Sequence, residues 1–405
     1  MPSASVELTY CTNVHPAESL GEVRDSLARF VVPVREAFSP DRPFGVGLRL
    51  SDQAARPLAG DAEERGRLRD WMGERDLRAF TVNGFVHGGF QVDGLKERVY
   101  EPTWTDDERV AYTLRVAEAL AGLLPEDVAG SVSTLAGTFR PRAHGEEASA
   151  ACATRYLEAA EGLRALRDRT GRTVRLALEP EPWTTLECAD DAVGFWERHL
   201  RPAATGVGMS PEETGEWLGL CYDTCHHAVA FDEPEASVAR LADAGVPIHK
   251  VQVSSALEVR EPGANPAAVE QLRAFDEPRF LHQTTGRRGD GSLLRALDLP
   301  TVFSGPGGAP AEGWLDCDAW RTHFHITIFL GELAPLATTR PDLVRTLEAV
   351  LAAGACDHLE VETYTWDVTP RAARERAAEG DLVTSLVREL TWAEAELARL
   401  GVHRR

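Results

Sequence analysis

The sequence is almost without lysine. Only Lys96 and Lys250 occur among its 405 residues, so arginine carries nearly all of the positive charge, and the formal net charge is -21. A polyanion would meet net repulsion from such a chain unless one face gathered its arginines. The composition therefore disfavours nucleic acid and anionic membrane surfaces as partners.

Several other features are missing. No apolar run approaches the roughly 20 residues that a membrane helix needs, and the opening MPSASVELTYCTNVHP has no basic region followed by an apolar core. The seven cysteines are scattered and contain no Cys-x-x-Cys pair, which indicates reduced, mostly buried residues in a cytoplasmic protein. The glycines of SGPGGAP do not lie between a strand and a helix, so we expect no dinucleotide or phosphate loop.

What the chain does contain is an alternation of short apolar strands and amphipathic helices. Helices are predicted at 147–169 and at 235–244, the second ending before Gly245. Eight strand-helix units predict a single (β/α)₈ TIM barrel over residues 1–405, with its site at the carboxyl ends of the strands. The eight predicted strands are 6–14, 44–50, 79–87, 130–136, 174–181, 219–223, 248–254 and 358–364.

The interval between the seventh and eighth strands breaks this rhythm. It holds about a hundred residues, which is too many for one helix, and it includes a tract rich in glycine and proline. Loops of this length in a compact domain are commonly functional. We therefore expect an insertion at 258–325 that projects over the active face as a lid or a substrate-binding excursion.

The segment LCYDTCHHAV contains the clearest chemical motif. Asp223 ends a short apolar strand and His226 follows three residues later. A carboxylate at the end of a strand, with an imidazole nearby, suits a metal or proton-transfer site. The alternative is that Asp223 caps a helix and that His226 lies on its solvated first turn.

Other predicted strands end in charged or polar side chains as well. Glu179 and Glu181 close the fifth strand on one face, at the end of a buried run. On the seventh strand Lys250 and Gln252 share a face, where Lys250 could pair with a carboxylate, contact substrate or extend to the surface. Glu362 ends the eighth strand, and charges inside a barrel are costly without a metal or a counter-charge.

Four histidines remain open to two interpretations. His323 and His325 share a face of an extended segment and could both bind one metal, although hydrogen-bonded core histidines show the same pattern. His87 ends the third strand beside glycines, and His282 lies in the insertion as a potential lid contact. For these last two a structural role is equally open.

Together these strand ends resemble a known family. Glu179 on the fifth strand, Asp223-x-x-His226 on the sixth and Glu362 on the eighth are similar to the xylose isomerase-like barrel superfamily, which includes sugar isomerases, ketose 3-epimerases and endonuclease IV-type nucleases. More closely, the chain resembles the E-protein family of the ebo metabolite-traffic gene cluster. The segments that carry this closer resemblance are LTYCTNVHP, KVQVSSA, LHQTTG, HFHITIF and HLEVETYTWDV.

The resemblance implies a divalent cation, Mn, Mg or Zn, held by Glu179, Asp223 and Glu362. Gln252 stands where the epimerases carry a ligand histidine. A neutral amide oxygen is a weaker zinc ligand than imidazole and suits manganese or magnesium better. The resemblance therefore leaves three possibilities: a hard metal bound with Gln252, His325 as the replacement ligand, or a lost metal centre.

The implied function is a metal-dependent isomerase or epimerase of a sugar, cyclitol or related polar metabolite, in a metabolite-traffic or secondary-metabolite pathway. Glu179 and Glu362 would take and return a proton beside a carbonyl. Two alternatives are a non-catalytic metabolite-binding or trafficking protein, acting with other proteins of the cluster, and an endonuclease IV-like phosphodiesterase. The expected substrate contacts are Glu181, Trp183, His226, His323, Lys250, His87 and His282.

Overall fold

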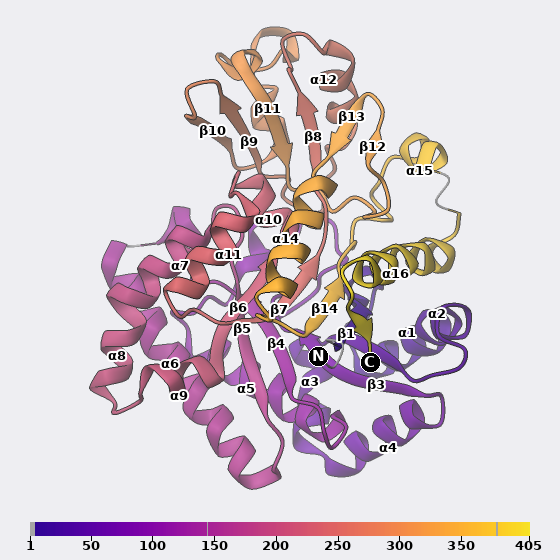
Figure 1. Cartoon of the computed structure of the whole chain (residues 1–405), viewed down its shortest axis with the longest axis vertical. Coiled ribbons are helices and arrows are strands. Elements are labelled where there is room, and N and C mark those ends of the chain that lie inside the picture. Colours follow the sequence, from indigo (N-terminus) through magenta and orange to yellow (C-terminus); the bar gives the residue numbers. More distant parts are fainter. Residues whose placement is uncertain (1–4, 144, 378–379) are drawn as a thin grey trace.

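Eight parallel strands form the centre of the molecule (Figure 1). The computed structural model describes residues 5–143, 145–377 and 380–405. The strand order is β1-β14-β7-β6-β5-β4-β3-β2, with β15 (His403–Arg404) added outside β1. The eight strands are β1 (Ser5–Tyr10), β2 (Phe44–Arg49), β3 (Leu77–Asn83), β4 (Gly130–Leu135), β5 (Val174–Glu179), β6 (Leu218–Asp223), β7 (Ile248–Val253) and β14 (His358–Val361).

The two ends of this sheet meet, so the protein is an α/β barrel. Cys11 and Gly47 form a parallel bridge between the ends of β1 and β2. Thr9 supports the junction, because its hydroxyl donates to the Gly45 carbonyl at 2.7 Å and accepts from the Gly47 amide at 3.0 Å. All eight predicted strands are present. Strands such as β6 and β7 are buried along their whole length, as expected when both faces of a parallel strand are covered.

Seven of the eight strands end earlier than predicted, three of them by three or more residues, and β5 ends at Glu179, so Glu181 lies beyond the strand that was expected to include it. The first was expected to reach residue 14, but β1 ends at Tyr10 and Thr12–Val14 forms a 3₁₀ turn. The third and eighth end at Asn83 and Val361 instead of 87 and 364. Beyond these points the chain leaves the ladder and turns, although its residues still favour strand.

Helices surround the barrel (Figure 1). The predicted helices at 147–169 and 235–244 are confirmed as α6 and α11, and Gly245 follows α11 with a φ of +62°, as expected for a helix-ending glycine. None of the helices in the described residues is long and apolar enough to cross a membrane. The helices up to β7 are α1 (Leu20–Ser26), α2 (Val32–Phe38), α3 (Asp52–Gly60), α4 (Ala62–Gly73), α5 (Asp107–Leu123), α6 (Gly145–Thr170), α7 (Ala189–Phe195), α8 (Arg201–Gly206), α9 (Pro211–Trp217), α10 (Thr224–Val229) and α11 (Pro234–Asp243).

A second, antiparallel sheet lies between β7 and β14 in the chain and projects from one end of the barrel (Figure 1). Its order is β10-β9-β11-β8-β13-β12. The stretch includes the residues 258–325 of the expected insertion, while the sheet itself runs from Leu257 to Thr338. Its strands are β8 (Leu257–Arg260), β9 (Thr284–Arg288), β10 (Leu293–Ala296), β11 (Cys317–Thr322), β12 (Glu332–Leu333) and β13 (Leu336–Thr338).

The second sheet has a hydrophobic core of its own. Trp314, Trp320 and Phe324 are buried in it together with side chains of β8. A larger cluster fills the space between the barrel and its helices. The two cores therefore lie on either side of the carboxyl ends of the barrel strands. The remaining helices are α12 (Pro266–Arg273), α13 (Leu299–Val302), α14 (Arg340–Ala352), α15 (Arg371–Ala377) and α16 (Leu382–Arg399).

Candidate functional site

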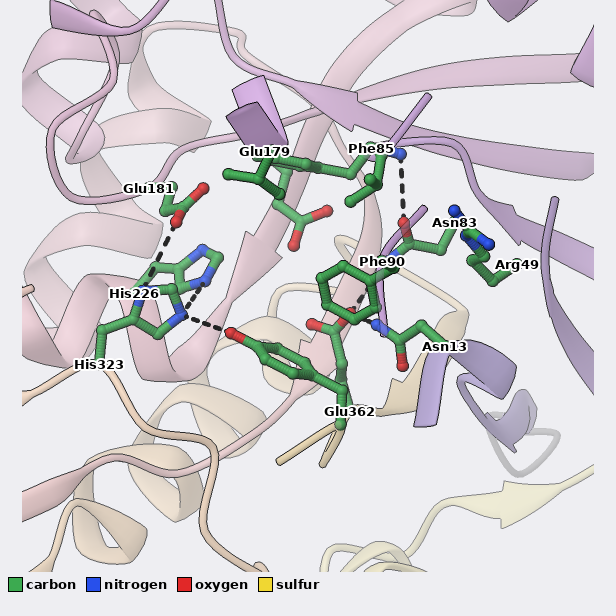
Figure 2. A pocket seen from close by; sticks show the side chains of 13 residues that line it. Asn13, Arg49, Asn83, Phe85, Phe90, Glu179, Glu181, His226, His323 and Glu362 are labelled. Atoms are coloured by element: carbon green, nitrogen blue, oxygen red, sulfur yellow. Dashed lines mark hydrogen bonds and ion pairs between the residues drawn. The ribbon is translucent and has the colours of Figure 1, made fainter. Parts of the chain in front are cut away.

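A narrow pocket lies at the carboxyl ends of the barrel strands (Figure 2). The space open to the centres of water molecules is about 50 Å³, which is room for several water-sized groups. Charged groups form one part of the lining and apolar side chains another. The lining residues are Asn13, Arg49, Asn83, Phe85, Val86, Phe90, Val99, Glu179, Glu181, His226, His323, Glu362 and Tyr364.

Asp223 has a different role for each carboxylate oxygen. Its Oδ1 accepts from the backbone amides of Cys225 at 2.7 Å and His226 at 3.0 Å, and from the Ser254 hydroxyl at 2.7 Å. Its Oδ2 is buried and has no hydrogen-bond partner in the described part of the chain. Asp223 therefore caps α10 and also offers a free oxygen. The expected solvated first turn is wrong, because His226 is buried.

Three buried carboxylates meet beside this free oxygen. Glu179, Asp223 and Glu362 each offer an oxygen, and these three atoms lie within 4.8 Å of one another. Glu362 Oε1 accepts from the amides of Asn13 at 2.8 Å and Asn83 at 2.9 Å. Glu179 Oε2 has no such partner among the described residues. The arrangement concentrates negative charge where burial makes it costly.

The pKa values of these carboxyl groups reflect the cost of burying negative charge. Burial, reinforced by repulsion between the carboxylates, raises the pKa of Glu179 and of Glu362 well above the usual range. Burial also acts to raise the pKa of Asp223, but His226, His325 and hydrogen bonds hold it below its usual value. Glu181 is raised to about 8 by burial. Without a cation, burial and mutual repulsion favour the protonated forms of Glu179, Glu181 and Glu362.

Three imidazoles form a second cluster next to the carboxylates. His323 Nε2 lies 3.1 Å from His226 Nε2 and 3.1 Å from His325 Nε2. Each Nδ1 faces an oxygen acceptor: Pro180 O at 2.9 Å for His226, Gln283 Oε1 at 2.7 Å for His323 and Glu362 O at 2.8 Å for His325. An imidazole that donates through Nδ1 in its neutral form has a lone pair on Nε2.

The three lone pairs therefore point toward one another. Burial lowers the pKa of His226 to about 4 and lowers those of His323 and His325, so the rings are neutral at pH 7. The Tyr364 hydroxyl, 3.2 Å from His323 Nε2, can donate to one of them. Two nitrogens bound to one tetrahedral zinc ion lie about 3.3 Å apart. The cluster therefore fits a transition metal, with each Nδ1 already fixed by a hydrogen bond.

The carboxylate and imidazole clusters meet at Asp223. Its Oδ2 lies 3.7 Å from His226 Nε2 and 3.9 Å from His325 Nε2. Gln252 pairs with Asp223 across β6 and β7, is fully buried, and has no hydrogen-bond partner for either amide atom in the described chain. These unpaired oxygens and nitrogens are what a bound divalent cation would satisfy, so the residues present fit a metal centre.

Four of the expected substrate contacts do not line the pocket. Lys250 is fully buried and forms an ion pair with Glu360 at 2.6 Å, so the carboxylate alternative holds for it. His87 lies beside Glu108 at 3.5 Å. His282 donates from Nδ1 to the His323 carbonyl at 2.9 Å, so it supports the site from behind. The remaining residue, Trp183, donates its indole N–H to the Ala296 carbonyl at 3.3 Å and joins β5 to the second sheet.

Sequence reasoning missed several residues that matter to the geometry. Asn13 and Asn83 follow β1 and end β3, and both hold Glu362; their position at strand ends was a usable signal. Gln283 accepts from His323 Nδ1 at 2.7 Å, and the Tyr364 hydroxyl lies 3.2 Å from His323 Nε2. Neither has a local pattern that separates it from an ordinary polar or aromatic residue.

No protein-family model matches the chain, and no curated protein matches it. Solved structures do match. An L-ribulose 3-epimerase shares 14% identity over 98% of this chain and 95% of its own, with a TM-score of 0.49. A xylose isomerase-like TIM barrel protein from Mycobacterium smegmatis in complex with magnesium shares 14%, over 97% and 99%, with a TM-score of 0.47. The IOLI protein with a binding zinc atom shares 11%, over 97% and 99%, also at 0.47. Likenesses at this level carry no information on substrate or reaction.

Proposed function

We propose that this chain is a metal-dependent isomerase or epimerase of a small polar metabolite, such as a sugar or a cyclitol. One observation carries the proposal: Glu179 and Glu362, from strands on different sides of the pocket, bring carboxyl oxygens together around the free oxygen of Asp223. No arginine or lysine of the described residues forms an ion pair with either glutamate. Two carboxyls placed in this way can exchange protons with a substrate held between them.

Glu179, Asp223 and Glu362 would hold the cation, with Gln252 or His325 completing the set. A divalent cation bound there withdraws electron density from a substrate carbonyl and makes the neighbouring C–H bond more acidic. The amide of Gln252 favours manganese or magnesium, whereas the imidazole nitrogens favour zinc.

The chain's own groups account for proton transfer. Asn13 and Asn83 hold Glu362 Oε1, which leaves Oε2 to accept or return a proton. Glu179 would do the same from the other side. Burial would limit the water around both groups during the transfer, and their protons would exchange with solvent when the site opens between turnovers.

The pocket favours an uncharged metabolite. Its one arginine, Arg49, donates from Nη1 to Glu18 at 2.7 Å and to the Ala17 carbonyl at 2.8 Å, which partly neutralises its charge. The lining also contains the apolar side chains of Phe85 and Phe90. A single arginine in the lining offers little to a DNA backbone, which speaks against the phosphodiesterase alternative.

We further propose that the inserted stretch acts as part of the site and as its lid. Phe280 packs on Phe90 and Tyr364, with ring centroids 5.0 Å and 4.9 Å apart. Lys96 joins the loop after β3 to the stretch by donating to the Phe280 carbonyl at 2.7 Å and to Asp298 at 2.7 Å. Substrate entry would require these contacts to open.

One observation favours a non-catalytic metabolite-binding protein as the second candidate. Gln252 offers a weaker ligand than imidazole, so metal affinity at the carboxylates could be too low for catalysis. The resemblance of the sequence to the ebo E-protein family supports a place in a metabolite-traffic or secondary-metabolite pathway for either candidate, with other proteins of that cluster as partners.

The test is proton exchange. Protein loaded with Mn, Mg or Zn is incubated in D₂O with a panel of ketoses, aldoses and keto-cyclitols, and deuterium uptake at carbon is followed by NMR. We expect exchange with at least one metabolite, and a fall of 10²-fold or more in Glu179→Gln and Glu362→Gln. Metal content is measured in parallel by elemental analysis.

The outcomes separate the candidates. Bound metal and a bound metabolite without exchange would select the binding protein. Full exchange in both glutamine variants would overturn the assignment of Glu179 and Glu362. Glu97→Gln, at an exposed position outside the pocket, serves as the control and should leave exchange unchanged.

A further inference from the structure

We propose that Gln283 is the positioning residue of the imidazole cluster: it holds His323 in the tautomer that carries its proton on Nδ1, and it thereby keeps Nε2 free toward the pocket. The inference rests on the proposed metal-dependent function and extends it to a residue outside the ligand set. Gln283 precedes β9, so it belongs to the inserted stretch and not to the barrel.

The hydrogen bonds of Gln283 fix which way its amide points. Its Nε2 lies 3.3 Å from the Pro182 carbonyl and 3.3 Å from Glu181 Oε1, both of which accept. It also donates to the Tyr100 hydroxyl at 2.7 Å, which in turn donates to Glu181 at 3.0 Å. The two N–H groups of the amide are therefore used by the Tyr100 hydroxyl at 2.7 Å and by the two acceptors at 3.3 Å, and Oε1 faces His323 Nδ1 at 2.7 Å.

His323 is the one ring of the three whose tautomer depends on a side chain. His226 and His325 donate from Nδ1 to the backbone carbonyls of Pro180 and Glu362, which no substitution removes. The acceptor for His323 is an amide that can be replaced. The tautomer of His323 therefore depends on one contact that a substitution can remove.

Loss of that contact has a definite consequence. Without Gln283, only Glu181 Oε1 remains near His323 Nδ1, at 3.5 Å, so the proton is better placed on Nε2, where the lone pair of His226 or His325 lies at 3.1 Å. His323 would then donate from Nε2 to a neighbouring imidazole, and this hydrogen bond would have to break before the three rings could bind a metal. Hydrogen-bond partners of metal ligands typically change affinity by 10–100-fold.

The test uses two variants and a matched control. Gln283→Met removes the acceptor, whereas Gln283→Glu keeps an acceptor facing Nδ1. Gln271→Met is the control, because Gln271 also lies in the inserted stretch and bonds to the Leu333 carbonyl, away from the pocket. The tautomers of metal-free protein are read from long-range ¹H–¹⁵N NMR of the histidine rings, and Co²⁺ affinity from chelator competition with the visible absorption spectrum.

We expect Nδ1–H at His323 in the full-length wild type, in Gln283→Glu and in the control, and Nε2–H in Gln283→Met with Co²⁺ bound 10–100-fold more weakly. Nε2–H in the wild type, or identical tautomers and affinities in both Gln283 variants, would overturn the inference. The NMR result does not need metal. A tautomer change in protein that binds no Co²⁺ would therefore support the positioning role while counting against the proposed function.

Discussion

Asp223 shows how one carboxylate can cap a helix and still present a free oxygen to a pocket. The sequence left open whether it caps a helix or belongs to a site. A carboxylate has two oxygens, and here Oδ1 accepts from three donors while Oδ2 accepts from none in the described chain. The hydrogen bonds to Oδ1 hold the carboxylate in place, and they thereby fix the direction in which Oδ2 points.

Two substitutions separate these roles. Asp223→Asn keeps an oxygen for the cap but loses the anionic oxygen, so we expect loss of bound metal with no loss of stability. Asp223→Ala removes the cap as well, which typically costs about 1 kcal/mol of unfolding free energy. Metal content and urea unfolding of chelated protein check the pair. Equal stability of the two variants would show that the cap contributes nothing.

The sequence could identify Glu179, Asp223 and Glu362 because the ends of parallel strands converge at one edge of a barrel. It could not identify Gln283, whose role depends on His323, 40 residues away. Nor could it decide between the partners open to Lys250, since the register that brings Glu360 beside it is a property of the folded sheet. Polar residues that act through a distant partner have no local pattern.

At the scale of elements, β2 fits into the barrel because Gly45 and Gly47 have no side chain. A Cβ on Gly47 would overlap the Glu360 carboxylate and lie 2.8 Å from the Tyr10 carbonyl. On Gly45 it would lie 2.6 Å from the Phe80 ring. The strand therefore leaves interior space for the Lys250–Glu360 pair, one layer below the pocket.

The same substitution should have opposite effects on a strand and on a helix. Gly47→Ala overpacks the barrel interior, and we expect it to lower the free energy of unfolding by about 1–3 kcal/mol. Gly66→Ala in α4 meets no atom within 4 Å and removes a flexible residue from a helix, so we expect a gain of about 0.5–1 kcal/mol. Denaturant unfolding measures both. A stabilised Gly47→Ala protein would contradict the packing argument.

The eight barrel strands were predictable because burial on both faces makes them continuous apolar runs. The strands of the second sheet were not predicted. β12 has two residues and β13 three, and β9 reads TTGRR, with neither alternation nor an apolar run. Such strands are defined by their partners across the ladder more than by their own composition.

At the scale of the whole molecule, the site lies where the barrel and the second sheet meet. His226 comes from the barrel, whereas His323 follows β11 of the second sheet. Their contact at 3.1 Å joins two parts of the chain with separate hydrophobic cores. A cation bound there would tie the two parts together, so its effect on stability should extend to the whole protein.

The buried titratable groups give the metal-free protein a definite dependence on pH. His226 and His358 have their pKa lowered to about 4 by burial, so between pH 4 and 6.5 the unfolded chain binds more protons and stability rises with pH. Glu181 has its pKa raised to about 8, so between pH 4.5 and 8 the folded chain binds more protons and stability falls. Glu179 and Glu362 act in the same direction as Glu181.

Above pH 6.5 the histidines no longer contribute, and only the carboxyls act. From pH 6.5 to 8 we expect Glu181 to lower the free energy of unfolding by about 2 kcal/mol, and we expect Glu179 and Glu362 to lower it further. Bound metal would keep Glu179 and Glu362 ionised in the folded protein, so their part of this fall should disappear when metal is added. Urea unfolding at pH 6.5 and 8.0, with chelator and with metal, measures the difference. Chelated protein that is equally stable or more stable at pH 8.0 would mean that these carboxyls release their protons without a cation.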